Sequence, residues 1–283
     1  MYANYWGLSD IPFRNTLDTR WFYQSPTHDE ALARLLFLIE NRRRCGVLSG
    51  AAGTGKSLLL GILAGEAART GGEIAHVDLV GRSSHEMLWE IVAELGVPAG
   101  PDDAATRLWR KLHDHILANR FARASLVLLL DHLDRAHAEC VAVVERLQHL
   151  ASSGEIGLTL IVGVRDGRTA VLAPVFREIS DLRIELDALD RTETQYYIET
   201  LLTRAGATQE LFDSSAIDRL FAETRGVPRH LNRLCDLALL AGMADHALRI
   251  DETIVTAAAE ELHVRLRTER PPLHFRHRVT AEV

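Results

Sequence analysis

The stretch from Gly50 to Ser57 has the residue types and spacing needed to hold a chain of phosphates. It reads GAAGTGKS and matches the pattern GxxxxGK[ST] in full. Its glycines let backbone N–H groups turn inward around phosphate oxygens, its lysine reaches the outer phosphates, and its final hydroxyl is a ligand for Mg²⁺. We therefore expect the stretch to bind ATP with Mg²⁺. The expected nucleotide-binding residues are Gly50, Ala51, Ala52, Gly53, Thr54, Gly55, Lys56 and Ser57.

A carboxylate at the end of an apolar run complements this loop. Leu126 to Leu130 are all apolar and are followed directly by Asp131. A buried strand that ends in aspartate is how such proteins hold Mg²⁺ through water, so we expect Ser57 and Asp131 to form the metal site. Because a further strand and its helices fit between the two residues, their strands need not be consecutive. This spacing indicates the branch of phosphate-loop proteins with an inserted central strand.

The residue after Asp131 bears on whether the nucleotide is hydrolysed. It is His132, where most ATPases with this pattern have a glutamate that activates water. Imidazole has a pKa near neutrality and can act as a general base. Asp134 is a second candidate, if a short loop brings its carboxylate to the site. Loss of a positioned base slows such reactions roughly 10²–10⁴-fold, so we expect slow turnover, with a switch that only holds its nucleotide as the alternative.

A parallel sheet is needed to bring these groups together. Short apolar runs alternate with helical patterns between residues 29 and 188, which is typical of an α/β domain. The runs expected to be strands are 45–49, 74–80, 126–130, 158–164 and 182–186. From Leu189 onward we find only helical patterns. The predicted fold is a P-loop NTPase, a RecA-like αβα sandwich over 29–188, followed by a small all-helical lid domain over 189–263.

Capping boxes mark two of the expected helix starts. Thr27 to Glu30 fits one and Thr192 to Gln195 fits another. Residues 1–28 form an irregular N-terminal segment ahead of the first helix, and residues 264–283 form an Arg-rich tail that we expect to be flexible.

Composition narrows the compartment and the partners. The net charge is −7, so there is no overall attraction to nucleic acid or to an anionic membrane. No stretch approaches the roughly 20 apolar residues of a membrane span, and the start lacks a secretory signal. The three cysteines are far apart and show no CxxC spacing, so we expect buried free thiols. These features predict a cytoplasmic protein without direct membrane insertion.

Beyond the loop, the sequence resembles a group of AAA+ ATPases: general secretion pathway protein A, related ATPases of pilus biogenesis, and the ATP-binding subunits of bacterial transposons. The motifs that carry the likeness are Tyr5-Trp6-Gly7-Leu8, Pro12-Phe13, Tyr23 with Ser25 and His28, Arg183-Ile184, and Gly226-Val227-Pro228-Arg229 with Asn232. The resemblance runs from about Tyr5 to Leu262, which is most of the chain.

The resemblance implies roles for particular residues. Leu8, Pro12 and Phe13 would lie in a linker that covers the adenine. Arg229 is similar to the sensor 2 arginine, which projects from the lid onto the γ-phosphate. Arg183 is similar to the arginine finger that acts on a neighbouring subunit's nucleotide, with Arg177 as a rival, and this role implies a homo-oligomer.

The sequence also departs from the family at two positions tied to hydrolysis. His132 replaces the usual glutamate, and Val164 stands where the family has a polar sensor 1 residue. The resemblance favours an ATPase that assembles a secretion or pilus-type apparatus. A DNA-acting ATPase of transposition type and a non-hydrolysing regulatory switch are the alternatives. The expected client is a protein of a secretion, pilus or transposition machine, and nucleic acid is not the favoured partner.

Overall fold

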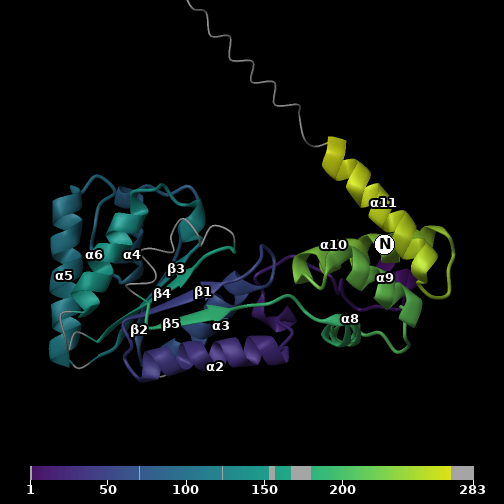
Figure 1. The fold of residues 1–283 in the computed structure, drawn as a ribbon, viewed down its shortest axis with the longest axis horizontal. Helices are drawn as coiled ribbons and strands as arrows, with labels where there is room; N and C mark the ends of the chain where they lie inside the picture. Colours follow the sequence, from purple (N-terminus) through teal and green to yellow (C-terminus); the bar gives the residue numbers. More distant parts are fainter. Residues whose placement is uncertain (1, 70, 123, 153–156, 167–179, 269–283) are drawn as a thin grey trace, which may run out of the picture.

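The computed structural model describes residues 2–69, 71–122, 124–152, 157–166 and 180–268. Two parts are visible in Figure 1, an α/β part built around a sheet and a smaller part built from helices.

The sheet is parallel throughout and has five strands in the order β2-β3-β4-β1-β5. The strands are β1 (Cys45–Ser49), β2 (Glu73–Asp78), β3 (Leu126–Asp131), β4 (Leu158–Gly163) and β5 (Leu182–Glu185). All five coincide with the predicted apolar runs. Strand β4 lies between the strand that precedes the phosphate loop and the strand that ends at Asp131. The predicted insertion of a central strand is therefore confirmed.

Helices cover both faces of the sheet (Figure 1). One face packs against α2 (Pro26–Glu40) and α3 (Lys56–Arg69). The other packs against α4 (Ser84–Glu94), α5 (Ala105–Ala122) and α6 (Cys140–Ser152). Every residue of β3 and β4 is buried, as expected for central strands covered on both sides. The predicted αβα sandwich is confirmed.

The helical part has a core of its own. It contains α8 (Arg191–Arg204), α9 (Ser214–Thr224), α10 (Pro228–Ala244) and α11 (Glu252–Thr268). The N-terminal segment, with α1 (Tyr2–Tyr5) and η1 (Thr19–Trp21), packs into this core, and the indole of Trp6 donates to the carbonyl of Leu239 at 2.9 Å. Helix α11 continues to Thr268, so its backbone includes the first residues that we expected in the tail.

Both helices begin two residues earlier than the predicted capping boxes. Ser25 caps α2 by accepting from the His28 N–H, and Pro26 takes the first helical position, where its missing N–H is harmless. Asp190 and Glu193 form the capping box of α8. The expected Thr27 and Thr192 caps are therefore wrong, because a better side-chain acceptor lies two residues earlier in each case.

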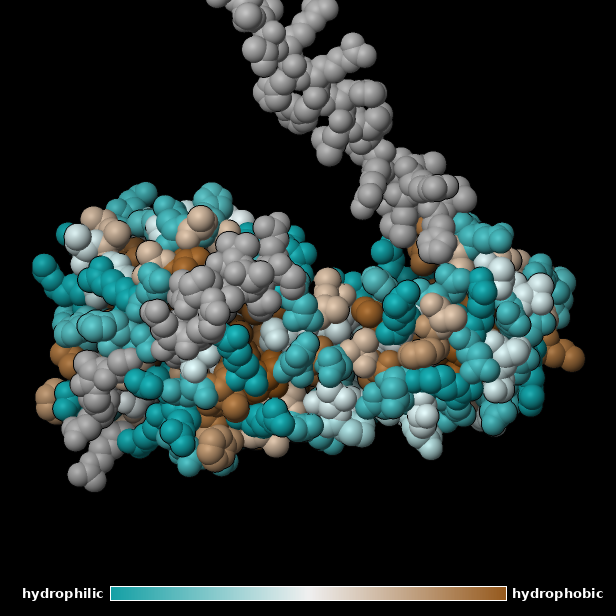
Figure 2. Space-filling model, viewed as in Figure 1, coloured by the Kyte–Doolittle hydropathy of each residue, from teal (hydrophilic) through white to brown (hydrophobic). Residues whose placement is uncertain are grey.

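All three cysteines are free and buried, as predicted. Burial raises the pKa of the Cys45 thiol to about 12 and that of Cys140 to about 11, which makes both unreactive near neutral pH. Hydrophilic residues cover most of the face seen in Figure 2. Among the described helices, none is both long and apolar enough to cross a membrane.

Candidate nucleotide-binding site

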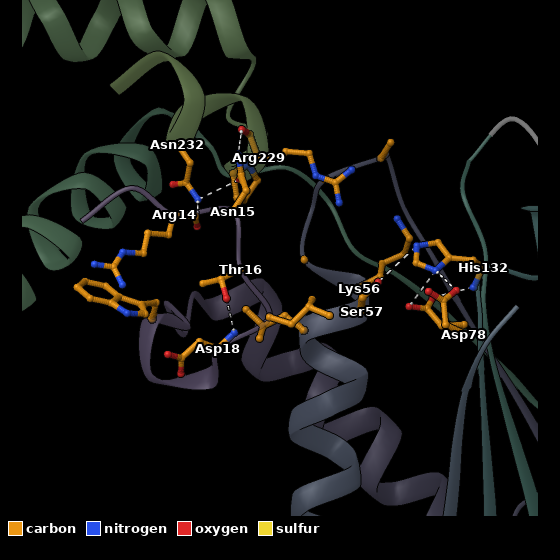
Figure 3. Close-up of a pocket in the computed structure, with 18 of the residues that line it drawn as sticks. Arg14, Asn15, Thr16, Asp18, Lys56, Ser57, Asp78, His132, Arg229 and Asn232 are labelled. Atoms are coloured by element: carbon orange, nitrogen blue, oxygen red, sulfur yellow. Dashed lines mark hydrogen bonds and ion pairs between the residues drawn. The ribbon is translucent and has the colours of Figure 1, made fainter. Parts of the chain in front are cut away.

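A cavity of about 570 Å³ lies at the carboxyl ends of the strands, between the α/β part and the helical part. Figure 3 shows Lys56 and Ser57 at the start of α3, with His132 and Asp78 on one side and Arg229 and Asn232 on the other. Many predicted site residues line this cavity. They are Pro12, Ala52, Gly53, Gly55, Lys56, Ser57, Asp131, His132 and Arg229.

The phosphate loop has the conformation that its glycines allow. Gly53 and Gly55 have φ angles of +94° and +102°, a region that is costly for residues with a Cβ. The ammonium of Lys56 donates to the carbonyls of Gly50 and Ala51, at 2.8 and 2.7 Å. Burial lowers the pKa of Lys56, while the carboxylates of Asp166 and Asp131 act in the opposite direction. The loop is thus already folded around its lysine.

His28 forms a hydrogen bond with the backbone of the phosphate loop. It is a buried residue in the first turn of α2, and its Nε2 lies 3.1 Å from the carbonyl oxygen of Thr54. Since a carbonyl only accepts, Nε2 carries the proton, and Nδ1 accepts from the hydroxyl of Ser25 at 2.8 Å. A Cβ on Gly55 would come within 2.9 Å of the imidazole. Ser25 and His28, two residues of the resemblance motifs, therefore fit closely against the phosphate loop.

The groups expected to hold Mg²⁺ lie on facing elements. Ser57 is the second residue of α3 and Asp131 is the last residue of β3, and both line the cavity. Asp131 is 3% exposed, and a Cβ on neighbouring Gly163 would lie 2.5 Å from its Oδ1, so the strand leaves space for this carboxylate. One hydroxyl and one carboxylate, with water completing the shell, suit Mg²⁺. The residues present therefore fit the metal that the fold implies.

His132 is held in a defined orientation. Its backbone is in the left-handed region, with φ of 57°, and its N–H donates to Asp131 Oδ1 at 2.8 Å. Its Nδ1 lies 2.9 Å from Asp78 Oδ1 and 3.4 Å from Asp131 Oδ2, while its Nε2 lies 3.5 Å from the hydroxyl of Ser57. The ring therefore stands beside the expected metal site, as Figure 3 shows.

Asp134 does not line the cavity. Its side chain is fully buried and accepts from Arg165 twice, from the side-chain Nε at 2.6 Å and from the backbone N–H at 3.2 Å. The expectation that its carboxylate swings toward the attacking water finds no support in this geometry, because both oxygens are already engaged. Arg165 itself lines the cavity.

The helical part meets the phosphate loop through the start of α10. Arg229 is the second residue of this helix, and its N–H donates to the carbonyl of Gly53 at 3.2 Å. The Gly53 position admits no Cβ, which would come within 2.7 Å of the Arg229 Cβ. Nearby, Asn232 donates to the carbonyl of Arg14 at 3.0 Å and accepts from Tyr197 at 2.7 Å. The N-terminal segment, the helical part and the loop are thereby linked.

Two of the three expected adenine contacts lie elsewhere. Leu8 and Phe13 are 6% and 4% exposed in the core of the helical part, and neither lines the cavity. Phe13 packs edge-on against Phe212, with ring centroids 6.2 Å apart. The sequence pattern did not distinguish core packing from a ligand contact, and packing prevails for these two. Pro12 does line the cavity.

Of the two candidate arginine fingers, Arg183 lies among the described residues and Arg177 does not. Arg183 is exposed on β5, one of the two edge strands, and does not line this chain's own cavity. Its Nε lies 3.4 Å from the hydroxyl of Ser180. Arg177 lies outside the described residues.

Several residues of the cavity escaped the sequence reasoning. From the N-terminal segment they are Arg14, Asn15, Thr16, Leu17, Asp18 and Trp21, and from the strand ends they are His76, Asp78 and Arg165. The strand ends carried a usable signal, since the carboxyl ends of parallel strands share one edge. The N-terminal segment has no periodicity that would have predicted its course.

Comparison with known proteins agrees with this geometry. Residues 39–166 match the family model described as an AAA domain. The matched residues include the phosphate loop, β3 and β4, so this part of the chain is similar to the AAA domains. General secretion pathway protein A of Aeromonas hydrophila is 27% identical over 266 residues, which cover 93% of this chain and 48% of that protein. The chain therefore spans about half the length of the curated relative that it matches.

Solved structures show the same fold at low sequence identity. Cdc6p from Pyrobaculum aerophilum matches with a TM-score of 0.69 and 16% identity over 92% of this chain and 74% of that chain. The Aeropyrum pernix ORC1 protein in complex with DNA gives 0.66 and 16% over 93% and 72%. The Thermotoga maritima RuvB Holliday junction branch migration motor gives 0.53 and 18% over 89% and 74%. These likenesses confirm the AAA+ fold and its P-loop core.

Proposed function

We propose that this protein is an AAA+ ATPase that binds ATP with Mg²⁺ and hydrolyses it slowly, with His132 as the general base. The observation that carries this proposal is the position of the His132 ring between Asp78 and Ser57. The ring lines the cavity at the place where the phosphate loop and the end of β3 come together.

The contacts of His132 determine which of its nitrogens is basic. A carboxylate only accepts hydrogen bonds, so in the neutral ring Nδ1 carries the proton toward Asp78 and Nε2 keeps its lone pair. That lone pair faces Ser57 and the cavity. Asp78 thus supports His132 as an aspartate orients the histidine of a hydrolytic triad.

The reaction that this arrangement supports is attack of water on the γ-phosphorus. The bond from the water oxygen to phosphorus forms, the bond from phosphorus to the bridging oxygen breaks, and ADP leaves with the electron pair. His132 Nε2 accepts the proton of the water. Lys56 binds the outer phosphates, and Mg²⁺ held by Ser57 and Asp131 neutralises their charge when bound.

The coupling of nucleotide state to shape would run through Arg229. Its N–H already bonds the phosphate loop at Gly53, so a change in the loop is passed directly to the start of α10. We propose that this change drives assembly with other copies, in which the exposed Arg183 acts on a neighbour's nucleotide. The likeness to general secretion pathway protein A suggests a protein client in a secretion-type apparatus. We propose that the protein acts in the cytoplasm.

The test is steady-state phosphate release, measured together with ATP binding. Lys56→Ala is expected to abolish both, whereas His132→Ala and Asp78→Asn are expected to keep binding and lose turnover. Unchanged turnover in His132→Ala would refute the assigned base. Arg183→Ala is expected to bind ATP and regain turnover when mixed with Lys56→Ala, which supplies the missing arginine in mixed oligomers; no recovery would argue against the finger.

The two alternatives are separated by the same assay. Tight ATP binding without turnover in the wild type, with turnover gained in His132→Glu, would make the protein a regulatory switch. Stimulation by DNA, together with steeply salt-dependent DNA binding, would favour the DNA-acting ATPase. The Aeropyrum pernix ORC1 structure is a complex with DNA, but its likeness to this chain concerns the fold alone.

A further inference from the structure

We infer that Arg165 is a phosphate-binding residue of this site, that it contacts the terminal phosphate of ATP, and that the buried carboxylate of Asp134 positions it. This inference rests on the proposed function, because it assigns a further residue to the same cavity. It identifies a cation from this chain itself, in addition to Lys56 and Arg229.

The first observation is the way in which Asp134 holds Arg165. One carboxylate oxygen accepts from the guanidinium Nε at 2.6 Å and the other accepts from the backbone N–H of the same residue at 3.2 Å. The Asp134 side chain has no exposed surface, whereas that of Arg165 is 37% exposed. The anion is thus enclosed and the cation is not, and both the backbone and the side chain of Arg165 are fixed by one partner.

The second observation is where the rest of the guanidinium lies. Arg165 lines the cavity together with Lys56, Ser57 and Asp131. Asp134 accepts from its Nε, and among the described residues its two terminal amino groups have no hydrogen-bond partner. A guanidinium has five N–H donors in a planar fork that matches phosphate oxygens. The geometry therefore leaves the outer edge of this fork for an anion in the cavity.

The third observation concerns the order of the strands. Arg165 follows β4 by two residues, and β4 lies between β1, which leads into the phosphate loop, and β3, which ends at Asp131. The outer phosphates must lie between the loop lysine and the metal carboxylate, because each of those groups binds them or their Mg²⁺. Arg165 therefore lies just beyond the end of the strand between these two groups, where the terminal phosphate is expected.

This placement also accounts for the apolar residue that precedes Arg165. Val164 is buried, and its N–H donates to the carbonyl of Leu48 at 2.9 Å. Its side chain is apolar and offers no hydrogen bond to the site. Arg165 supplies charge at the end of the same strand. Arg165 forms and breaks no covalent bond during hydrolysis. Its N–H groups donate to oxygens of the terminal phosphate and stabilise their negative charge.

The experiment compares the affinities for ATP and ADP, each with Mg²⁺, by displacement of a fluorescent nucleotide. Arg165→Ala alone would leave a buried carboxylate unpaired and destabilise the fold, so the variant used is Asp134→Asn with Arg165→Gln. Its neutral amides replace the ion pair. A guanidinium on the terminal phosphate predicts that ATP affinity falls roughly 10- to 100-fold while ADP affinity stays within roughly threefold. Asp134→Asn alone is expected to lose part of the ATP preference, since Arg165 then keeps its charge but not its anchor.

A matched control exists at the other end of the strands. Asp181 likewise accepts from the backbone N–H of Arg44 at 2.7 Å and from its side chain at 2.9 Å, away from the cavity. Asp181→Asn with Arg44→Gln is expected to leave both affinities unchanged. Equal weakening of ATP and ADP, or no weakening, in the Arg165 variant would overturn the inference. If the wild type itself fails to bind ATP in a Lys56-dependent manner, the proposed function fails first and the inference falls with it.

Discussion

His28 offers a sharp test of how the phosphate loop is held, because its two ring nitrogens have different partners. Nε2 donates to the Thr54 carbonyl and Nδ1 accepts from the Ser25 hydroxyl. The amide nitrogen of glutamine reaches about as far as Nε2, and that of asparagine about as far as Nδ1. His28→Gln can therefore keep the bond to the loop and lose the Ser25 bond, whereas His28→Asn loses the loop bond.

The expected magnitudes follow from burial. Ser25 and Thr54 are 0% exposed, and His28 is 4% exposed. An orphaned buried polar group costs about 1–3 kcal/mol, so each substitution is expected to lower the free energy of unfolding by about that amount. His28→Asn is expected also to weaken ATP binding about tenfold, which corresponds to about 1.4 kcal/mol spent on ordering the loop. His28→Gln is expected to change ATP affinity little.

The assay combines urea unfolding, followed by tryptophan fluorescence, with the dissociation constant for ATP and Mg²⁺. Similar stability losses in the two variants, with weaker ATP binding only in His28→Asn, would assign the effect to the bond with Thr54. Equal ATP affinity in both variants would refute the reasoning, because the loop would then keep its shape without this bond.

Two further predictions rest on single contacts. Gly163→Ala is expected to weaken ATP binding in the presence of Mg²⁺ more than in EDTA, since a Cβ there lies 2.5 Å from Asp131 Oδ1 and displaces the metal-binding carboxylate; equal effects in both buffers would contradict this. Burial lowers the pKa of His28 below its ordinary 6.5, more than the bond to Thr54 raises it, so the unfolded chain binds the proton more readily. The stability that neutral His28 contributes is present above about pH 6.5 and is lost as the pH falls through its folded pKa. Urea unfolding between about pH 7.5 and about pH 5.5 is expected to show a steeper loss in the wild type than in His28→Gln, and identical slopes would count against it.

The sequence by itself determined the features that depend on neighbouring residues. The phosphate loop is a local motif, and its glycines, Lys56 and Ser57 act through backbone geometry within one turn. The central strands were recognised because a strand buried on both faces must be largely apolar, as in β3. Their alternation with helices then implied a parallel sheet, since parallel strands require crossover connections.

Only the tertiary structure decided which distant side chains meet. Asp134 follows β3 and Arg165 follows β4, and nothing in the spacing indicated that the carboxylate would pair with the arginine. The sequence likewise did not predict a role for Asp78, which lies beside His132 because β2 pairs with β3. Leu8 and Phe13 are apolar residues that fit an adenine site and a core equally well, and the packing of the helical part assigned them to its core. The sequence shows whether a side chain is apolar or charged. Which residue it contacts depends on the strand order and on how the helices pack against the sheet.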